Sequence, residues 1–299
     1  MTITNTAAPV PSPLPWISAD EVFARVSFER AARAIQRDLR AGQLLLMPTQ
    51  SSEFVGVKVA TVAPGNPALG LERIQGVYLL MDAATLSPIA LIDGTALTTL
   101  RTPAVSAAAA DLLAPVAVEH LVVFGSGPQA WGHIEAMRGI RSIGRVSIVA
   151  RNQERAAALA ERVRASGLTA AVGTAESVRD AQLIVCATTA RTPLFDGTLV
   201  PDDSCTVAVG SHEPDARELP SALIARAQLV VEDTAVALRE AGDLLVPIGE
   251  GAIATDALVP MRDVLTGSIV VDHSRPRVFK SSGMSWEDLV IAAEVFRAS

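Results

Sequence analysis

Apolar and polar positions in the second half of the chain form short apolar runs that alternate with segments of helical periodicity. A run at Leu121–Phe124 precedes a helical segment that begins at Pro128, and a run at Val146–Ala150 precedes a helical segment over Gln153–Ala165. Further apolar runs of strand length follow at Leu183–Ala187, Thr206–Val209, Leu229–Val231 and Ile269–Val271. Strands that alternate with helices at this spacing predict an α/β fold with a parallel, doubly wound sheet.

The first half of the chain has a different pattern, with a period of two between residues 44 and 92. This period predicts three β-strands, over Phe54–Val62, Gly76–Met81 and Pro88–Ile92, with a turn at residues 64–67. Thr102 and Pro103 are typical of an N-cap and a first helical position, so we expect a helix from there to residue 113. The boundary between the two halves then falls near residues 113–117.

The two ends of the chain carry their own signals. Residues 1–15 are rich in proline, and we expect a mobile tail. Ser18 and Glu21 have the spacing of a capping box, which predicts a helix that runs to Leu39. A last helix is predicted over Ser285–Arg297, after a basic loop at Arg275–Lys280, and it could return to pack on the first half.

Composition restricts the class of protein. The chain has 299 residues, with 25 Lys and Arg against 32 Asp and Glu, and the net charge of −7 argues against a protein that binds nucleic acid or anionic membranes. Hydrophobic residues (49%) are sufficient for a large core. No segment has the pattern of a signal peptide or a membrane-spanning helix, and Cys186 and Cys205 lie in apolar runs. We therefore expect a soluble protein of the reducing cytoplasm.

A glycine-rich loop follows the predicted strand at Leu121–Phe124. Gly125 permits a tight turn, Gly127 lets a pyrophosphate approach the backbone, and Ala130 lets the next helix lie close to the strand. The N-terminus of that helix adds free N–H groups. The loop therefore predicts a dinucleotide site made by Gly125, Ser126, Gly127, Pro128, Gln129 and Ala130. A tight turn that binds nothing is the alternative.

The end of the next strand bears on which dinucleotide binds. A carboxylate at this position usually accepts hydrogen bonds from the ribose hydroxyls of NAD. Here the strand ends in Arg151 and Asn152, without an acidic residue. A cation there can pair with a 2′-phosphate, so we expect NAD(P), with NADP favoured over NAD. An exposed arginine at the start of a helix is the alternative.

Several short segments, taken in chain order, are also those of a known family. They are Gly56–Val59, Pro64–Pro67, Ile92–Gly94, Thr98–Ser106, Gly125–Ala130, Glu240–Leu244 and Phe279–Met284. With them, the chain after the tail resembles the ornithine cyclodeaminase/mu-crystallin family. The resemblance implies a central NAD(P)-binding Rossmann domain (residues 117–275). It also implies a discontinuous α+β domain (residues 16–116 and 276–299) that binds the substrate and forms a homodimer.

The resemblance assigns roles to two cations. Lys58 matches the family lysine that faces the substrate beside the nicotinamide. A lysine in an apolar strand is unfavourable unless it is paired or lines a cavity, and burial would lower its pKa and suit proton transfer. Arg101 matches the arginine that holds the substrate carboxylate, which a guanidinium can grip by two parallel hydrogen bonds. By residue type alone, Lys58 could lie on a solvent face and Arg101 could form a surface ion pair.

Further residues match positions at the cofactor. Thr102 matches a threonine beside the phosphates, although a plain helix cap accounts for its residue type equally well. Thr188 and Val209 match positions that line the nicotinamide, and are otherwise ordinary strand ends. Ser281 and Ser282 belong to the matching late loop. These residues complete the expected cofactor-binding set, and we assign no metal ligands.

The chain departs from the cyclodeaminase branch of this family at three positions. His212 stands where that branch has an aspartate for the substrate amine; it can exchange protons near neutral pH, or it can be a loop histidine without chemistry. Leu45 replaces a glutamate, and Arg151 replaces the acid expected for NAD. Each change removes a group suited to a dicationic substrate, which favours a smaller substrate with one carboxylate.

Three functions follow as hypotheses. The first is an NAD(P)H-dependent reductase or dehydrogenase of a small α-imino or α-amino acid, with hydride transfer at Cα, a proton from Lys58 or His212, and the carboxylate on Arg101. The second is ornithine cyclodeaminase, a lyase that forms proline and ammonia with recycled NAD. The third is a non-catalytic protein that binds a small ligand, as mu-crystallin binds thyroid hormone.

Overall fold

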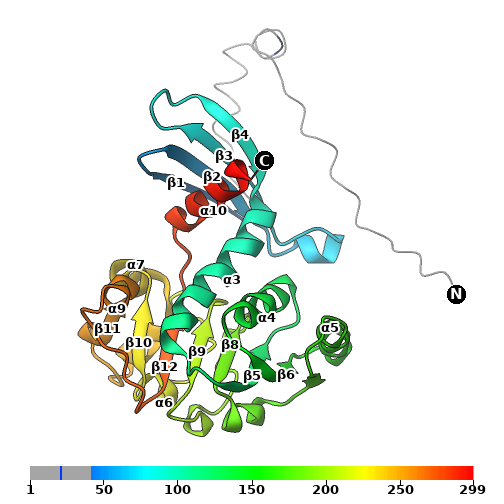
Figure 1. The fold of residues 1–299 in the computed structure, drawn as a ribbon, viewed down its shortest axis with the longest axis vertical. Helices are drawn as coiled ribbons and strands as arrows, with labels where there is room; N and C mark the ends of the chain where they lie inside the picture. The colour runs from blue at the N-terminus through cyan, green and yellow to red at the C-terminus, as the bar shows by residue number, and fades with distance from the viewer. Residues whose placement is uncertain (1–20, 22–41, 299) are drawn as a thin grey trace, which may run out of the picture.

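The computed structural model describes residue 21 and residues 42–298, and shows two β-sheets with the long helix α3 (Gly94–Leu113) running between them (Figure 1). The expected tail over residues 1–15 and the expected helix from Ser18 to Leu39 lie outside the described residues, apart from Glu21. Along the described part of the chain, no helix is long and apolar enough to span a membrane.

The larger sheet is parallel throughout, as the alternation of strands and helices predicts. Its order within the described residues is β11-β10-β12-β9-β8-β5-β6-β7. The strands are β5 (Val118–Phe124), β6 (Ile143–Val149), β7 (Ala170–Val172), β8 (Leu183–Cys186), β9 (Cys205–Ala208), β10 (Gln228–Val231), β11 (Leu258–Pro260) and β12 (Arg277–Lys280). The fold class is therefore confirmed as α/β with a doubly wound parallel sheet.

Alternate side chains of these strands enter two hydrophobic cores, one on each face of the sheet. Leu121 and Val123 of β5 enter the first core, and Val122 and Phe124 enter the second. The first core is closed by α3, α4 (Pro128–Ile140), α5 (Gln153–Ala165) and α9 (Met261–Leu265). The second is closed by α6 (Ser221–Ile224), α7 (Thr234–Glu240), α8 (Gly242–Gly249) and the 3₁₀ helices η2 (Ala175–Asp180) and η3 (Gly197–Leu199).

The last strand of the larger sheet differs from our prediction. Ile269–Val271 is not a strand, and the segment expected as a basic loop contains β12, which lies between β9 and β10. Arg277 and Lys280, whose charges favoured a loop, are fully buried. The guanidinium of Arg277 donates to the carbonyl oxygen of Leu113 at 2.8 Å, so its charge is satisfied inside the protein. Residues 277–280 thus lie in the larger sheet, although we expected them with the other domain.

The start of α3 also differs from our prediction. The helix begins at Gly94, because the Asp93 side chain accepts from the N–H groups of Thr95 and Ala96 and caps it. Thr102 is therefore not an N-cap, and Pro103 lies inside the helix. Because α3 starts directly after β4 and continues to the larger sheet, it packs against both sheets.

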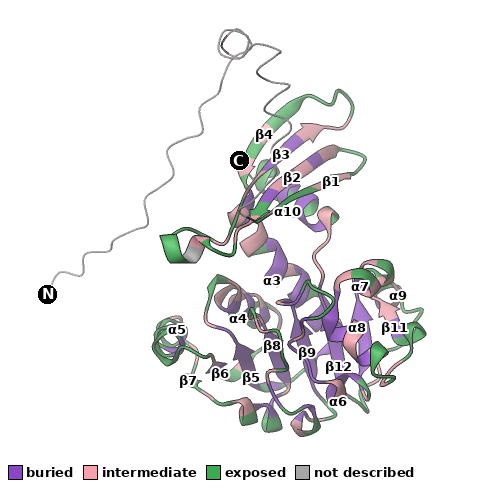
Figure 2. Cartoon of the chain, turned by 180° about the vertical axis from the view of Figure 1, so that it is seen from behind, coloured by how far each residue is buried: buried purple, intermediate pink, exposed green. Residues whose placement is uncertain are grey.

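The smaller sheet is antiparallel, in the order β1-β2-β3-β4. Its strands are β1 (Gln43–Gln50), β2 (Phe54–Val62), β3 (Ile74–Asp82) and β4 (Pro88–Asp93), with the 3₁₀ helix η1 (Asn66–Leu69) between β2 and β3. The last helix, α10 (Ser285–Arg297), packs on this sheet and on α3, where Leu289 and Ala292 meet Tyr78 and Leu97. The largest buried areas lie along the strands of the larger sheet and on α3 (Figure 2). A further 3₁₀ helix, η4 (Thr255–Ala257), precedes β11.

Candidate active site

The glycine loop follows the carboxyl end of β5, which is an interior strand of the larger sheet. Gly125 has φ +117°, and a Cβ there would lie 2.4 Å from the carbonyl oxygen of Ala187. Gly127 is the N-cap of α4, and no heavy atom lies within 4 Å of the place a Cβ would take. Pro128 is the first residue of α4, and Ala130 is fully buried against the sheet. The open space before the α4 N-terminus fits the phosphates of a dinucleotide.

One residue of α3, Thr98, joins this loop to Lys58. Gln129 of the loop donates from Nε2 to the carbonyl oxygen of Thr98 at 3.4 Å. Lys58 of β2 donates from Nζ to the hydroxyl oxygen of Thr98 at 3.3 Å. Lys58 and Gln129 of the predicted cofactor loop, which are 71 residues apart in the chain, therefore both contact a single threonine.

Lys58 is buried, with 2% of its surface exposed, so it does not lie on a solvent face. Its Nζ lies 2.6 Å from Oδ2 of Asp288, an acid in the first turn of α10. Burial lowers the pKa of Lys58 and the charge of Arg101 lowers it further, while Asp288 acts in the opposite direction. A buried lysine with a lowered pKa and one carboxylate partner is suited to proton transfer.

Arg101 is also buried, so it is not a surface ion-pair residue. Its Nη1 donates to Oε2 of Glu287 at 2.8 Å, and its Nε lies 3.3 Å from Oδ1 of Asp288. Asp288 therefore lies between the two predicted catalytic cations. Gly283 closes the other side, since a Cβ there would lie 2.8 Å from Nη1 of Arg101. Arg101, Lys58, Glu287 and Asp288 form one buried charge cluster from β2, α3 and α10.

The late loop that contains Ser281 and Ser282 holds a third acid beside this cluster. Glu232, which follows β10, accepts from the Ser281 hydroxyl at 2.7 Å and from the Ser282 backbone N–H at 2.6 Å. The N–H of Gly283 lies 3.2 Å from the same carboxylate. Burial raises the pKa of Glu287 to about 8, and the negative charge of Glu232 is the next cause. Ser281 and Ser282 therefore position an acid in this structure.

The loops after β8 and β9 are joined by Glu218, which is fully buried. One carboxylate oxygen accepts from the N–H and hydroxyl of Thr188, both at 2.7 Å, and the other accepts from the N–H of Gly210 at 2.7 Å. Burial raises the pKa of Glu218, and the charge of Asp243 raises it further. Glu218 thus holds Thr188 and the segment after Val209 at the carboxyl edge of the sheet.

Thr102 and His212 differ in their surroundings. Thr102 is buried in the middle of α3, one residue after Arg101. His212 lies in the loop after β9, where one part of its side chain is exposed and the rest is covered by protein. Desolvation by the surrounding protein lowers the pKa of His212, and the charges of Lys280 and Arg101 lower it further. His212 is therefore neutral near pH 7 and a weak source of protons.

Arg151 and Asn152 follow β6 and are both exposed. The Asn152 side chain accepts from the N–H of Arg155 at 2.9 Å and caps α5. Within the described residues Arg151 makes no ion pair or side-chain hydrogen bond, so its guanidinium is available to a ligand. Ser126 of the glycine loop keeps partial exposure.

The acids of this site were missed at the level of sequence. Glu287 and Asp288 lie in the first turn of α10, where acids are common because they complement the helix dipole. Glu218 and Glu232 stand in segments without a recognisable motif. Asp243 and Lys280 belong to motifs that carried the family resemblance, and Lys280 Nζ lies 3.6 Å from Asp243 in the interior. All of these side chains except Glu232 are buried, and the local sequence does not show that burial.

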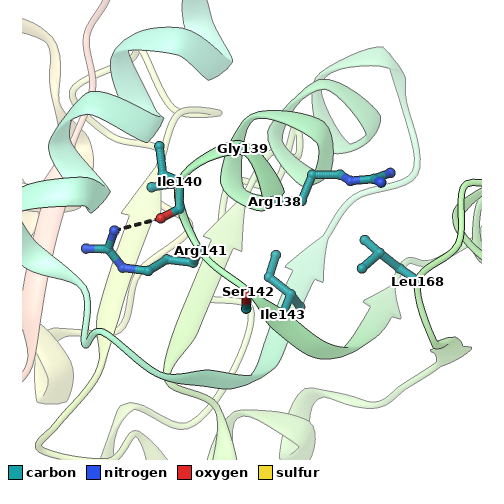
Figure 3. A pocket seen from close by; sticks show the side chains of 7 residues that line it. All are labelled: Arg138, Gly139, Ile140, Arg141, Ser142, Ile143 and Leu168. Atoms are coloured by element: carbon teal, nitrogen blue, oxygen red, sulfur yellow. Dashed lines mark hydrogen bonds between the residues drawn. The ribbon is translucent and has the colours of Figure 1, made fainter.

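A surface pocket lies elsewhere, between the end of α4 and the start of β6 (Figure 3). Its lining consists of Arg138, Gly139, Ile140, Arg141, Ser142, Ile143 and Leu168. Arg141 folds back onto the carbonyl oxygen of Ile140 at 2.8 Å. Ligands of parallel α/β sheets bind at the carboxyl ends of strands, and this pocket lies at the amino end of β6.

The parallel sheet and its open glycine loop are typical of a dinucleotide-binding α/β protein. The buried lysine and arginine beside the loop are typical of an enzyme's active site. The model of the ornithine cyclodeaminase/mu-crystallin family matches residues 21–298. The chain belongs to this family.

Several proteins that are similar to this chain, from different organisms, are named as reductases. The chain is 36% identical to a Delta(1)-pyrroline-2-carboxylate reductase of Bacillus cereus, over 84% of this chain and 80% of that protein. It is 33% identical to the ketimine reductase mu-crystallin of Mus musculus, over 85% and 80%. The structure of Thermococcus litoralis Delta(1)-pyrroline-2-carboxylate reductase in complex with NADH and L-proline is 30% identical, with a TM-score of 0.80 over 85% of this chain and 81% of that one.

Proposed function

We propose that this chain is an NAD(P)H-dependent reductase of a small cyclic α-imino acid with one carboxylate. The observation that carries the proposal is Thr98, which contacts both Lys58 and the glycine loop. A substrate held near Lys58 therefore lies next to a dinucleotide held by that loop. The named relatives, which are pyrroline-2-carboxylate and ketimine reductases, support the same reaction class.

The residues of the charge cluster have complementary roles in this reaction. When bound, the nicotinamide cofactor supplies a hydride to Cα of the imine. Arg101 holds the substrate carboxylate and so orients Cα. Nζ of Lys58 donates one proton to the imine nitrogen, and the product is the amine. His212 is the weaker candidate for this step, because its lowered pKa leaves it neutral.

NADPH is the proposed reductant. Arg151 is exposed at the end of β6 and, among the described residues, has no carboxylate partner that would compete for its charge. No acidic residue stands at this strand end to accept from a ribose 2′-hydroxyl. Both observations support pairing of Arg151 with a 2′-phosphate.

The smaller sheet with α3 and α10 is proposed as the substrate and dimerisation domain. Apolar side chains are exposed on it, among them Leu46 and Leu91 (both 63%) and Val290 (53%). An apolar surface of this kind supports the expected homodimer. Both cysteines are free and buried, which supports a reducing cytoplasm.

The proposal is tested by following NADPH and NADH oxidation at 340 nm with Delta(1)-pyrroline-2-carboxylate and other cyclic imino acids. We expect stoichiometric oxidation of NADPH by an imine, and loss of turnover in Lys58→Ala with NADPH still bound. A parallel reaction with ornithine and NAD is assayed for ammonia. Ammonia release without net cofactor change would show a cyclodeaminase instead, and a fully active Lys58→Ala variant would refute the role of Lys58.

A further inference from the structure

The loops after β8 and β9 lie on the side of the sheet where the nicotinamide half of a dinucleotide belongs. In the larger sheet β6 lies on one side of β5, and β8 and then β9 lie on the other. A dinucleotide with its pyrophosphate at the glycine loop and its adenosine ribose at the end of β6 therefore extends its nicotinamide over β8 and β9. The glycine loop also touches this region, because a Cβ on Gly125 would lie 2.4 Å from the carbonyl oxygen of Ala187, the residue before Thr188.

Glu218 ties these two loops together from the interior. Its carboxylate oxygens accept from the N–H and hydroxyl of Thr188 and from the N–H of Gly210, each at 2.7 Å. The loops are also in direct contact. A Cβ on Gly210 would lie 2.1 Å from the carbonyl oxygen of Thr188 and 2.6 Å from a carboxylate oxygen of Glu218, so a larger residue would push the loops apart.

The hydroxyl group of Thr188 is fully occupied by these contacts. It donates its only proton to Glu218 at 2.7 Å and accepts from the N–H of Ala190 at 3.0 Å. No hydroxyl proton remains for a cofactor. Thr188 therefore sets the position of its loop, and Glu218 is the group through which it does so.

The carboxylate of Glu218 is itself held in place by two neighbours. Oδ1 of Asp243 accepts from the backbone N–H groups of Glu218 and Leu219, at 2.6 Å and 2.8 Å. Nζ of Lys280 lies 3.6 Å from Oδ2 of Asp243 and donates to the carbonyl oxygen of Ser281 at 2.7 Å. The side chains of Glu218, Asp243 and Lys280 are all fully buried. The position of Glu218 is thus fixed by the fold before any cofactor arrives.

We propose that Glu218 is a positioning residue, which fixes the loops after β8 and β9 so that the nicotinamide ring lies within reach of the substrate. This rests on the proposed function, in which NADPH reduces an imine beside Lys58. The phosphates of NADPH are assigned to the glycine loop and Arg151, so the loss of Glu218 acts on the position of the ring and not on capture of the cofactor. The reacting atoms must approach to about 3–3.5 Å, and a misplacement of about 1 Å can slow the reaction about 100-fold.

Glu218→Gln is the decisive variant, because it keeps the size of the side chain and replaces one acceptor oxygen by an NH₂ group. That group faces the N–H of either Gly210 or Thr188, and two donors repel each other. We expect kcat with Delta(1)-pyrroline-2-carboxylate to fall by about 10–100-fold. The Kd of NADPH, measured by fluorescence titration, should change little.

An isotope effect separates a misplaced nicotinamide from a merely less stable protein. With NADPH deuterated at the transferred position of C4, kcat of Glu218→Gln should show a primary isotope effect, because hydride transfer is the step that has become slow. His120→Gln is the matched control. His120 is a buried residue of β5 that bonds to Ser147 at 2.8 Å and to Asp180 at 3.0 Å, away from both loops. Its replacement should lower the free energy of unfolding and leave kcat unchanged.

The other outcomes distinguish the possible errors. A native kcat in Glu218→Gln, a loss of kcat without an isotope effect, or an equal loss in His120→Gln would overturn the positioning role and leave the proposed function intact. A native enzyme that binds NADPH but reduces no cyclic imino acid would overturn the proposed function, and this inference with it.

A second variant serves if Glu218→Gln does not fold. Thr188→Val keeps the size of the side chain and removes one of the three hydrogen bonds to Glu218. Its kcat should also fall, with the same isotope effect and with NADPH still bound. An unchanged kcat in Thr188→Val would refute the link between Glu218 and the nicotinamide.

Discussion

Lys58 and Arg101 are two cations removed from water, and Asp288 is the residue that contacts both. The carboxylate lies 2.6 Å from Lys58 and 3.3 Å from Arg101, and its own surface is fully buried. A buried charge without a partner is strongly destabilising, so this single side chain both stabilises the fold and sets the charge of the site.

Asp288→Asn should therefore change the pH dependence of the reaction. Since Asp288 raises the pKa of Lys58, its neutralisation lowers that pKa further, and the alkaline limb of the kcat profile should move to lower pH. Breaking the buried pair should also reduce the free energy of unfolding by about 3–5 kcal/mol. Glu294→Gln is the control for both measurements. An alkaline limb that stays in place would contradict the role of Asp288.

Arg151→Ala should change the choice of cofactor without affecting the fold, because the side chain is exposed. A hydrogen bond between charged groups contributes about 1.5–3 kcal/mol, so the ratio of kcat/KM for NADPH over NADH should fall by roughly 10–100-fold. Steady-state kinetics with both cofactors measure this ratio. Arg155→Ala, also exposed and one turn into α5, should change it much less. Equal ratios in native and Arg151→Ala enzymes would refute NADPH recognition by Arg151.

At the scale of elements, the turn from β5 into α4 needs its two glycines for different reasons. Gly125 is required by its positive φ and by the carbonyl of Ala187, whereas Gly127 has ordinary φ (−91°) and open space beside it. Gly125 is therefore required by the backbone conformation of the fold. Gly127 instead leaves room for a ligand to approach the N-terminus of α4.

Substituting each glycine by alanine separates these roles. Gly125→Ala should lose about 1–3 kcal/mol of unfolding free energy from backbone strain alone, and more from the contact with Ala187. Gly127→Ala should unfold at nearly the native urea concentration but bind NADPH more weakly, because its methyl group occupies the approach to the phosphates. Urea denaturation and fluorescence titration with NADPH measure the two effects. Unchanged NADPH affinity in Gly127→Ala would argue against a phosphate site at this loop.

At the scale of the whole molecule, α3 connects the two sheets, and its contact with α4 contains a buried histidine. His133 of α4 hydrogen bonds to Ser106 of α3 at 2.9 Å, and to the backbone carbonyl of Gln129. Burial lowers the pKa of His133 to about 4. The folded protein thus holds this ring neutral well below the pH at which the unfolded chain protonates it.

Stability should therefore fall as the solution is acidified. The contribution of His133 is complete above an unfolded pKa near 6.5 and is lost as pH falls toward about 4, because the unfolded state binds the proton first. Between about pH 7 and pH 5 this one group should reduce the free energy of unfolding by about 2 kcal/mol. Urea denaturation of the native protein and of His133→Gln measures the difference, and the exposed His273→Gln is the control. Parallel pH profiles for the native protein and His133→Gln would contradict this assignment.

The sequence by itself determined the parallel α/β sheet, the glycine loop and the choice of Lys58, Arg101 and Arg151 as candidates. The sheet and the glycine loop follow from hydrophobic period and turn residues, which depend on neighbours a few positions apart. Lys58 and Arg101 were chosen because of the resemblance to the family, and Arg151 because no acid stands at its strand end. The burial of Lys58 and Arg101 agrees with their predicted roles, while the cofactor and substrate contacts themselves remain predictions.

Only the tertiary structure decided the start of α3, the place of β12 and the acids of the charge cluster. The charge of Arg277 favoured a loop over β12, because the carbonyl oxygen that satisfies it lies 164 residues earlier, at Leu113. Glu287 meets Arg101 across 186 residues. The free energy of burying a charge depends on the partner that folding brings to it, and no local pattern shows that partner.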